Sequence, residues 1–364
     1  MNEANKHLPL LGIDNPWKDN SNVIWLGSTI TLNRNLEKFN FPGKLENDKK
    51  KQIISLVGKD LLAHPSLKNP KLIKAEDMLP IEKEFLGEHF LSPQSFHQAH
   101  AGEAFILDET GQFLGLFNLT DHLSLQWIDC KGELEATWDR LVQIEMQLNK
   151  KINFAYSPQF GFLTSDPTQS GTALIVYIYL HLPSLIYSGT LNQIISGYKD
   201  DGIEQTGLQG DPNEIIGDIV VFHNAYTLGV TEENIISSLH TFATKLQGEE
   251  KKLRLQMKKE ESPSMKNRIS RAFAILLHSY QIEAVEALNA ISLLKLGVDL
   301  DWVTGTTIAS LNELSFNCRR AHLLCQCGSK ISQEEVLHKR AEFIHHALKG
   351  ARLHIEEDHP PELS

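Results

Sequence analysis

The spacing of hydrophobic positions over the first hundred residues predicts a polar arm followed by short helices. Residues 1–20 are polar and include Asn15-Pro16, so we expect a flexible N-terminal arm. Residues 21–100 carry short apolar stretches between proline and glycine breaks, and residues 49–62 have the clearest helical spacing. We therefore interpret residues 21–100 as the helical N-terminal part of a larger domain.

The hydrophobic period changes after Gly102. Short apolar runs at residues 105–107, 113–117 and 123–127 alternate with polar turn residues. Strand-length apolar runs separated by turns are typical of a β-meander. This part of the chain therefore predicts antiparallel strands.

Helices and strands are expected to alternate after this meander. Residues 134–148 place leucine, tryptophan and isoleucine on one helical face. Residues 160–165 and 215–222 have the apolar character of strands, and a helix is expected between Thr168 and Pro183. We interpret residues 101–260 as an antiparallel-sheet domain with flanking helices.

A long helix and a helical C-terminal domain complete the prediction. Thr231 can cap a helix whose apolar face ends at Leu246 and whose continuation, residues 249–261, is dense in mixed charge. Ser262-Pro263-Ser264 marks a boundary, and the chain beyond it has helical spacing. The predicted fold class is α+β, with residues 261–364 forming an all-helical C-terminal domain for dimerisation or regulation.

Composition and charge exclude several classes of protein. The formal net charge of −11 argues against a general nucleic-acid binder and against tight binding to anionic membranes. No apolar run is long enough to span a bilayer, and the N-terminus does not resemble a secretion signal. Four cysteines are too few for a disulfide framework, so a cytoplasmic location is expected.

Two short motifs have cysteine or histidine pairs at a spacing that some metal sites use. Cys325-Gln-Cys327 lacks a second cysteine or histidine pair at finger spacing, and His97-Gln-Ala-His100 lacks an acidic helper. No metal site is predicted.

Arginine is unusually scarce in the first two thirds of the chain. Arg34 and Arg140 are the only arginines among residues 1–250. The guanidinium group is the side chain that grips phosphate at two points, and lysine does not reproduce that geometry. Side chains that bind phosphate at two points are therefore nearly absent from this part of the sequence.

Five segments resemble, in order and approximate spacing, those of the bacterial protein-arginine kinases of the guanidino (phosphagen) kinase superfamily. They read IWLGSTITLNRN (24–35), EHFLSP (88–93), NLTDHLSLQ (118–126), GFLTSDPTQSGTAL (161–174) and GLQGDPNE (207–214). The likeness extends from about residue 20 to 315. It implies a guanidino-kinase fold, with a central antiparallel sheet flanked by helices and a C-terminal all-helical domain.

The resemblance also implies the family's chemistry, in which a guanidinium nitrogen attacks the γ-phosphate of ATP bound with magnesium. Arginines hold the phosphates, and acidic residues position and deprotonate the guanidinium. The family's nucleotide-binding positions fall on Gly27, Ser28, Thr29, Ile30, Thr31, His89, Ser124, Ile175 and Thr206. Its catalytic positions fall on Leu119, Thr120, Asp166 and Asp211.

Most of these positions carry a different chemistry here. Five family arginines are replaced by Thr29, Thr31, Ser124, Ile175 and Thr206. Leu119 and Thr120 stand for two glutamates, Asp166 stands for a reactive cysteine, and Asp211 stands for a glutamate. Loss of one charged contact to a desolvated phosphate costs roughly 2–4 kcal/mol. Loss of a general base lowers the rate by a further factor of ~10²–10⁴.

The sequence therefore favours a pseudokinase that acts as a regulatory or adaptor protein in protein quality control. One alternative is an active ATP-dependent protein-arginine phosphotransferase with a remodelled site. Another is a small-ligand binder without catalysis, lined by hydroxyl groups. ATP binding is in doubt under the first and third hypotheses.

Several residues also have purely structural interpretations. His89 fits a buried or surface histidine, Asp121-His122 fits a hairpin turn, and Arg34 fits a stabilising ion pair. The family's C-terminal phosphoarginine pocket, built on an Arg-Asp-x-x-Arg-Ala motif, corresponds to about residues 330–341, where the first arginine and the aspartate are missing. The resemblance implies a homodimer, a zinc-finger activator protein and the Clp protease machinery as partners.

Overall fold

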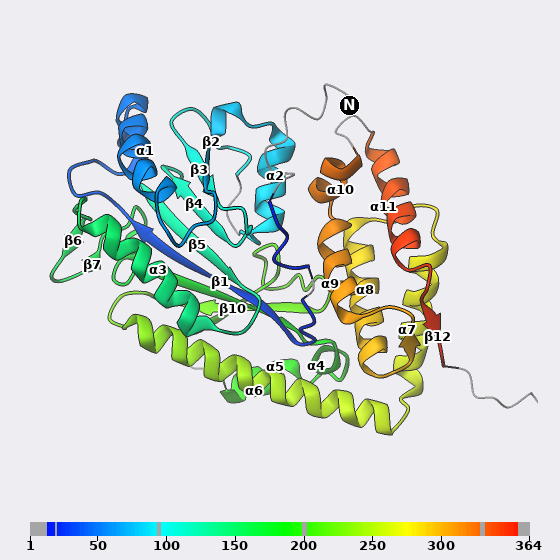
Figure 1. Ribbon diagram of the computed structural model, residues 1–364. Coiled ribbons are helices and arrows are strands. Elements are labelled where there is room, and N and C mark those ends of the chain that lie inside the picture. Colours follow the sequence, from blue (N-terminus) through cyan, green and yellow to red (C-terminus); the bar gives the residue numbers. More distant parts are fainter. Residues whose placement is uncertain (1–12, 19, 93–95, 199–201, 328–331, 356–364) are drawn as a thin grey trace, which may run out of the picture.

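The computed structural model describes residues 13–18, 20–92, 96–198, 202–327 and 332–355. An eight-stranded sheet lies at one end of the molecule and a group of helices at the other (Figure 1). Its strands are β1 (Trp25–Arg34), β2 (Lys71–Lys74), β3 (Ala104–Leu107), β4 (Phe113–Phe117), β5 (Leu123–Asp129), β8 (Leu174–His181), β9 (Ile203–Thr206) and β10 (Ile219–Asn224).

Every strand in this sheet pairs antiparallel with its neighbours, in the order β2-β3-β4-β5-β1-β8-β10-β9. The meander predicted for residues 105–127 is confirmed as β3, β4 and β5. Two short antiparallel strand pairs lie outside the sheet. One is formed by β6 (Tyr156–Ser157) with β7 (Gly161–Phe162), and the other by β11 (Val303–Thr304) with β12 (Arg352–Leu353).

Two sequence predictions were wrong, and both concern central strands. Residues 25–34, within the stretch predicted to be helical, form β1 at the middle of the sheet. Residues 174–181, predicted as part of a helix, form β8 beside it. β-Branched and aromatic residues dominate β8, and such side chains fit a pleated sheet better than a helix. The strand predicted at residues 160–165 is reduced to the two residues of β7.

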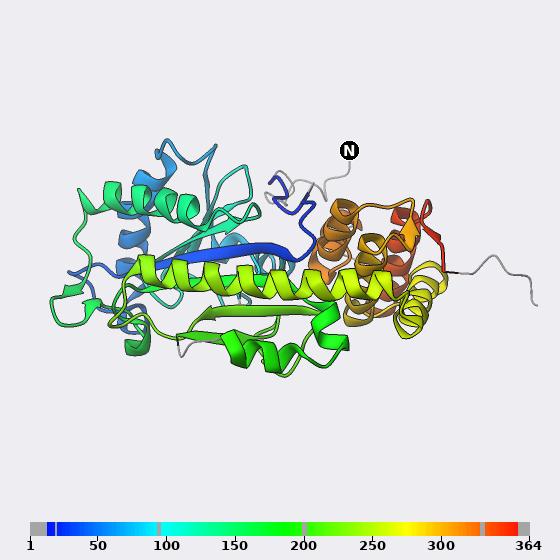
Figure 2. The ribbon, with the colours of Figure 1, turned by 90° about the horizontal axis from the view of Figure 1, so that it is seen from below.

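Helices α1 (Asn47–Leu62), α3 (Leu134–Asn149) and α6 (Glu232–Lys259) pack on one face of the sheet. Figure 2 shows α6 running along the strands toward the C-terminal helices. Thr231 caps α6 by accepting a hydrogen bond from the backbone N–H of Asn234 at 3.2 Å, as the sequence predicted. The core between helices and sheet is built from Ile30, Leu32, Leu125, Leu141, Val176, Phe222, Leu239 and their neighbours.

The other face of the sheet is only partly covered. Helix α2 (Pro80–His89) packs over β3, β4 and β5. The short helices α4 (Pro183–Tyr187) and α5 (Leu191–Tyr198) follow β8 and pack beside α6, in the core of the first face. The segment predicted as a flexible arm includes Trp17, which is buried here against Phe316.

The C-terminal helices have a hydrophobic core of their own. They are α7 (Pro263–His278), α8 (Ala284–Asp299), α9 (Ile308–Asn317), α10 (Arg320–Cys327) and α11 (Gln333–Ala347). The chain turns between α6 and α7 at residues 260–262, where Ser262-Pro263-Ser264 was noted as a boundary. No helix in the described part of the chain is long and apolar enough to cross a membrane.

Candidate functional site

The side chains of β1 alternate between the two faces of the sheet. Ile30 and Leu32 enter the core beneath α3 and α6, so Thr29 and Thr31 point to the opposite face. Residues directly opposite one another in an antiparallel pair share a face. Thr31 is opposite Ile175 of β8 on one side and Gln126 of β5 on the other.

The same pairing brings the remaining substituted positions to this face. Ser124 of β5 is opposite Asn33 of β1, two residues along the strand from Thr31. Thr206 of β9 is opposite Val221 of β10, which is itself opposite Tyr179 of β8. We call this surface the hydroxyl face. It carries the five positions at which the resemblance expects arginine, namely Thr29, Thr31, Ser124, Ile175 and Thr206.

Gly27, Ser28 and Ile30 have structural surroundings instead. Ser28 accepts a hydrogen bond from Nε1 of Trp25 at 2.9 Å, and Ile30 is fully buried. A Cβ at Gly27 would lie 2.8 Å from the ring of Trp17, so this position needs glycine for close packing. Of residues 27–31, therefore, only Thr29 and Thr31 place a side chain on the hydroxyl face, and Gly27, opposite Tyr179, contributes backbone there.

Tyrosine and aliphatic side chains fill one end of the hydroxyl face. Leu26, Tyr179, Ile219 and Val221 are buried together there. The Tyr179 hydroxyl donates a hydrogen bond to the carbonyl of Leu91 at 3.0 Å, and burial raises the pKa of this phenol. These four side chains are largely hydrocarbon, Lys295 and Arg319 line the hollow beside them, and the phenol stays uncharged at neutral pH.

Asp121 and His122 fix the conformation of the 118–122 turn through their hydrogen bonds, whereas no side-chain hydrogen bond of Leu119 or Thr120 is found among the described residues. Asp121 Oδ1 accepts hydrogen bonds from Nδ2 of Asn35 at 2.6 Å and from the backbone N–H of Ser165 at 2.7 Å. His122 accepts from the N–H of Leu36 at Nδ1, 2.9 Å away, which makes it a neutral ring that donates from Nε2 to the Asn40 carbonyl. Burial lowers the pKa of His122 accordingly.

Leu119 and Thr120 form the tip of that turn. Leu119 packs at the edge of the cluster beneath α2, and Thr120 is exposed to solvent. Neither side chain can accept a proton from a substrate guanidinium. The positions that the resemblance assigns to a general base are chemically inert.

Asp166 and Asp211 are both exposed turn residues. Asp166 Oδ1 accepts hydrogen bonds from the hydroxyl of Thr168 at 2.7 Å and from its backbone N–H at 3.0 Å, and these bonds lower the pKa of the carboxyl. Asp211 Oδ1 accepts from the backbone N–H of Asn213 at 2.8 Å. Asp166 therefore carries a negative charge where the resemblance expects a cysteine.

His89 lies in the core rather than on the hydroxyl face. Its Nε2 is 3.0 Å from the Gly111 carbonyl, and its ring stacks on Phe85. Burial, with a contribution from the charge of His322, lowers the pKa of His89 to about 3. The neutral ring fits the structural interpretation of this histidine.

The two arginines of residues 1–250 both lie on the helix-covered side of the sheet. Arg34 is buried, and its Nε donates to Glu145 Oε1 of α3 at 2.6 Å. Its Nη1 also donates to the carbonyls of Asn33 and Thr172. Arg140 belongs to α3 itself and lies over the ring of Trp127. Neither guanidinium is available to the hydroxyl face.

The arginine of the comparable C-terminal motif is also engaged internally. Arg340 is buried, and it donates to the carbonyls of Cys318 at 2.7 Å and Ile282 at 2.8 Å. Residues 328–331, which begin the compared stretch, lie outside the described residues. No three histidine, cysteine, aspartate or glutamate side chains gather as a metal site would require, within the part of the chain that the structure describes.

Tyr177, Tyr179 and Gln126 belong to the hydroxyl face but were missed in the sequence. Gln126 donates a hydrogen bond from Nε2 to the Phe90 carbonyl at 2.7 Å, and Tyr177 is opposite Thr29. The alternation of β8 would have indicated the tyrosines, had residues 174–181 been interpreted as a strand.

Comparison with known proteins gives consistent matches. Residues 52–253 match the family model described as ATP:guanido phosphotransferase, C-terminal catalytic domain, and residues 262–359 match the Protein-arginine kinase McsB C-terminal domain. The protein-arginine kinase of Chlamydia pneumoniae is 35% identical over 341 residues, covering 91% of this chain and 93% of that protein. That of Halothermothrix orenii is 31% identical and covers 88% of this chain and 92% of that protein.

Solved structures of guanidino kinases share the fold at lower sequence identity. Lombricine kinase superposes with a TM-score of 0.56 at 17% identity, covering 67% of this chain and 70% of that one. The duplicated taurocyamine kinase from Schistosoma mansoni gives 0.54 at 19% identity, covering 72% of this chain and 41% of that one. With its guanidino-kinase fold and with relatives similar over most of its length, this chain belongs to the protein-arginine kinase family of ATP:guanido phosphotransferases.

Proposed function

We propose that this protein is a pseudokinase of the protein-arginine kinase family, acting as a regulatory or adaptor protein in protein quality control. The hydroxyl face is the observation that carries the proposal. Strand register collects Thr29, Thr31, Ser124, Ile175 and Thr206 on one surface, without a guanidinium among them. Neutralising the charge of three phosphates would require several arginines at these positions.

The electrostatics of this surface do not fit a nucleotide triphosphate with magnesium. Each missing charged contact to a desolvated phosphate costs roughly 2–4 kcal/mol, and the loss of two already lowers the rate by orders of magnitude. Asp166 adds a negative charge, and the side chains of Leu26, Ile219 and Val221 at one end of the face have no group that could bind phosphate. ATP and magnesium, which the family uses, are therefore not expected to bind tightly.

A general base is also missing from the positions that the resemblance assigns to it. Leu119 is aliphatic and Thr120 is a solvent-exposed hydroxyl. The neighbouring Asp121 is buried, and its Oδ1 accepts hydrogen bonds from Asn35 and Ser165. Deprotonation of a guanidinium therefore has no acceptor at positions 119 and 120.

The proposed role requires surfaces at which the protein binds its partners. We propose that the protein acts in the cytoplasm as a homodimer, and that its partners are a zinc-finger activator protein and the Clp protease machinery. A hollow of about 530 Å³ lies over α7 and α8 between Arg271, Ile275, Val285 and Leu293. This surface supports dimerisation through the C-terminal helices.

Two assays test catalysis and nucleotide binding separately. We expect no rise in melting temperature with 5 mM ATP and magnesium, and no transfer of labelled phosphate to an arginine-rich protein, with or without the zinc-finger activator. Ordered triphosphate on the hydroxyl face together with arginine-phosphorylated product would establish the competing hypothesis of an active kinase. ATP-independent stabilisation by an uncharged or cationic small molecule would establish the ligand-binding alternative.

The adaptor role needs its own measurement. Purified protein should co-elute with the zinc-finger activator or with a Clp chaperone in size-exclusion chromatography, as a dimer. A monomer that elutes alone in every combination would leave the adaptor proposal without support and count against it.

A further inference from the structure

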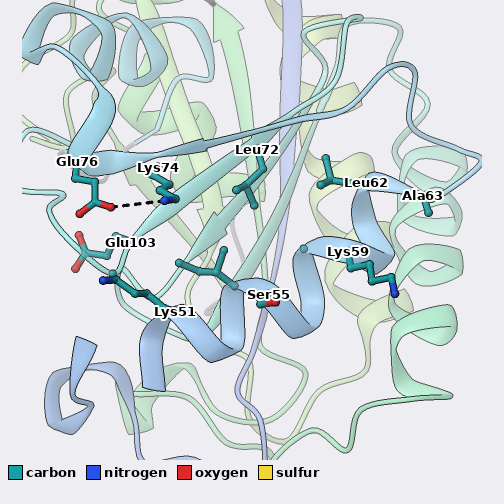
Figure 3. Close-up of a pocket in the computed structure, with 12 residues that line it drawn as sticks. Lys51, Ser55, Lys59, Leu62, Ala63, Leu72, Lys74, Glu76 and Glu103 are labelled. Carbon is teal, nitrogen blue, oxygen red and sulfur yellow. Dashed lines mark ion pairs between the residues drawn. The ribbon is translucent and has the colours of Figure 1, made fainter. Parts of the chain in front are cut away.

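A lysine-rich groove lies at the β2 edge of the sheet, and β9 forms the opposite edge. It runs between α1 and the edge strand β2, and Figure 3 shows its lining residues. The hollow measures about 560 Å³. Its apolar lining comes from Ile54 and Leu62 on α1, from Ala63 directly after α1, and from Leu72 on β2.

Close packing of α1 on β2 shapes the floor of this groove. A Cβ at Gly58 would lie 3.1 Å from Cδ1 of Leu72, so glycine lets the helix approach the strand at this point. Leu62 remains 40% exposed at the rim of the groove. Large aliphatic side chains left open to solvent beside a concave surface are typical of binding sites.

The charge around the groove is opposite to that of the whole protein. Residues 49–74 contain seven lysines and one acidic residue, whereas the full chain has a net charge of −11. Lys51 and Lys59 form no ion pair with any residue that the structure describes. Of the acidic lining residues, Glu103 lies 3.3 Å from Lys50 and Glu76 lies 3.9 Å from Lys74. The uncompensated charge at the groove is thus positive.

The free edge of β2 supplies backbone groups as well. Ala75 donates its N–H to the Glu103 carbonyl, next to the last β2–β3 pair. In an antiparallel ladder alternate residues bond to the partner strand, so the backbone groups of Leu72 and Lys74 face away from β3. A second hollow of about 370 Å³, lined by Lys71 and Ile73, lies on the other face of the same strand. An added strand would therefore find a pocket for alternate side chains on each side.

Edge lysines often serve only to prevent strands from pairing between molecules. That explanation covers Lys71 and Lys74, which belong to β2. It does not cover Lys51 and Lys59, which belong to α1 and flank the aliphatic lining from the helix side. Their placement suits a bound segment that has acidic side chains next to apolar ones.

We propose that the groove between α1 and β2 is a docking site for an extended acidic segment of a partner protein. The segment pairs with the edge of β2, inserts aliphatic side chains between Leu62 and Leu72, and places carboxylates beside Lys51 and Lys59. This site lies four strands from β1, so its occupation does not depend on whether the hydroxyl face transfers phosphate.

The test uses the full-length protein and a fluorescein-labelled decapeptide in which glutamate alternates with leucine. Fluorescence anisotropy should show saturable binding that weakens on raising NaCl from 50 to 500 mM. K51E/K59E should weaken binding at least tenfold, whereas K131E/K251E, with the same change in net charge on exposed lysines elsewhere, should stay within twofold. S55W should fill the groove and weaken binding at least tenfold, while S237W on the exposed side of α6 should not.

Hydrogen exchange gives a readout of strand pairing that a non-specific charge effect would not produce. The amides of Leu72 and Lys74 should gain protection when the peptide binds. The proposal is overturned if binding is absent at 1 mM peptide, or if the two charge-reversal variants behave alike. It is also overturned if single-stranded DNA binds at the lysines with no effect of S55W, or if a peptide of this chain's own residues 355–364 binds in the acidic peptide's place at equal affinity.

Discussion

The hydroxyl of Ser292 on α8 lies 2.8 Å from Nε2 of His181 at the end of β8. The same hydroxyl is 2.5 Å from Oδ2 of Asp218, so it donates to the carboxylate and accepts from the imidazole. Ser292 thereby joins the last residue of a central strand to the C-terminal helices through a fully buried contact. Arg254 of α6 adds to it by donating to the His181 carbonyl at 3.0 Å.

Removal of the Ser292 hydroxyl should destabilise the protein measurably. In S292A both His181 and Asp218 lose a buried partner, and each unpaired buried polar group costs roughly 1–3 kcal/mol. We expect a decrease of about 2 kcal/mol in the free energy of unfolding by urea, with no change for S237A on the surface of α6. Equal stability of S292A and wild type would mean that the contact contributes nothing.

Replacement of Arg34 tests whether this arginine is structural. The guanidinium is 1% exposed and serves Glu145, Asn33 and Thr172 together. Breaking a buried ion pair by removing one partner typically costs about 3–5 kcal/mol. R34A should therefore unfold at much lower urea concentration than R140A, whose guanidinium only lies over Trp127.

R34K should rescue R34A only in part, because one ammonium cannot reach three acceptors in the geometry of the guanidinium fork. If R34A folded with wild-type stability but changed nucleotide binding, the arginine would belong to a ligand site instead.

The fold was predictable where the hydrophobic pattern was unambiguous and not elsewhere. The meander from Phe105 to Trp127 and the capped helix after Thr231 followed from spacing alone. β8 was mistaken for a helix because a continuous apolar run such as residues 174–182 has no period that separates a buried strand from a buried helix. β1 was missed because hydroxyl residues occupy one of its faces, so that it resembles a polar segment.

The site could be predicted only in part. Motif comparison identified Thr29, Thr31, Ser124, Ile175 and Thr206 one by one, but only strand register places them on one surface. The α1–β2 groove had no sequence signal, since β2 is four residues long and its partner helix precedes it by eight residues. Contacts that depend on strand register and on packing between segments separated in sequence cannot be predicted from the local hydrophobic pattern.

The lowered pKa of His89 should make the protein less stable in mild acid, because only the unfolded chain takes up a proton at this residue there. The pKa of this buried ring is lowered to about 3, whereas a histidine in an unfolded chain titrates near pH 6.5. Between these two values the unfolded chain binds a proton that the folded chain does not, so the free energy of unfolding falls as the pH falls. The effect is absent above about pH 7, where neither state is protonated at this residue.

Urea unfolding from pH 7 to pH 4 measures this dependence. The slope of the free energy of unfolding against pH should be steeper for wild type than for H89Q by up to about 1.4 kcal/mol per pH unit, which is the value for uptake of one proton. Burial also lowers the pKa values of His64, His122 and His181. These three histidines are present in both proteins, so their contributions to the slope cancel in the comparison. H97Q removes an exposed histidine and should retain the wild-type slope.

Arginines restored to the hydroxyl face should restore affinity for nucleotide before they restore catalysis. Thr31 and Ile175 are opposite one another on β1 and β8, and both are half-buried, so longer side chains can extend from them toward solvent. Each new charge-assisted contact to phosphate is worth about 1.5–3 kcal/mol, which corresponds to a gain of roughly 10- to 100-fold in affinity. T31R/I175R should therefore show ATP-dependent stabilisation that wild type lacks.

The melting temperature with and without 5 mM ATP and magnesium is the measurement, and T31L/I175L is the control for size without charge. In the absence of ATP, T31R/I175R should melt below wild type, because like charges directly opposite on neighbouring strands repel. Phosphoryl transfer should remain undetectable, since Leu119 and Thr120 still provide no base. Stabilisation of T31L/I175L by ATP, or of wild type to the same extent, would show that the missing guanidinium groups are not what keeps triphosphate away from this face.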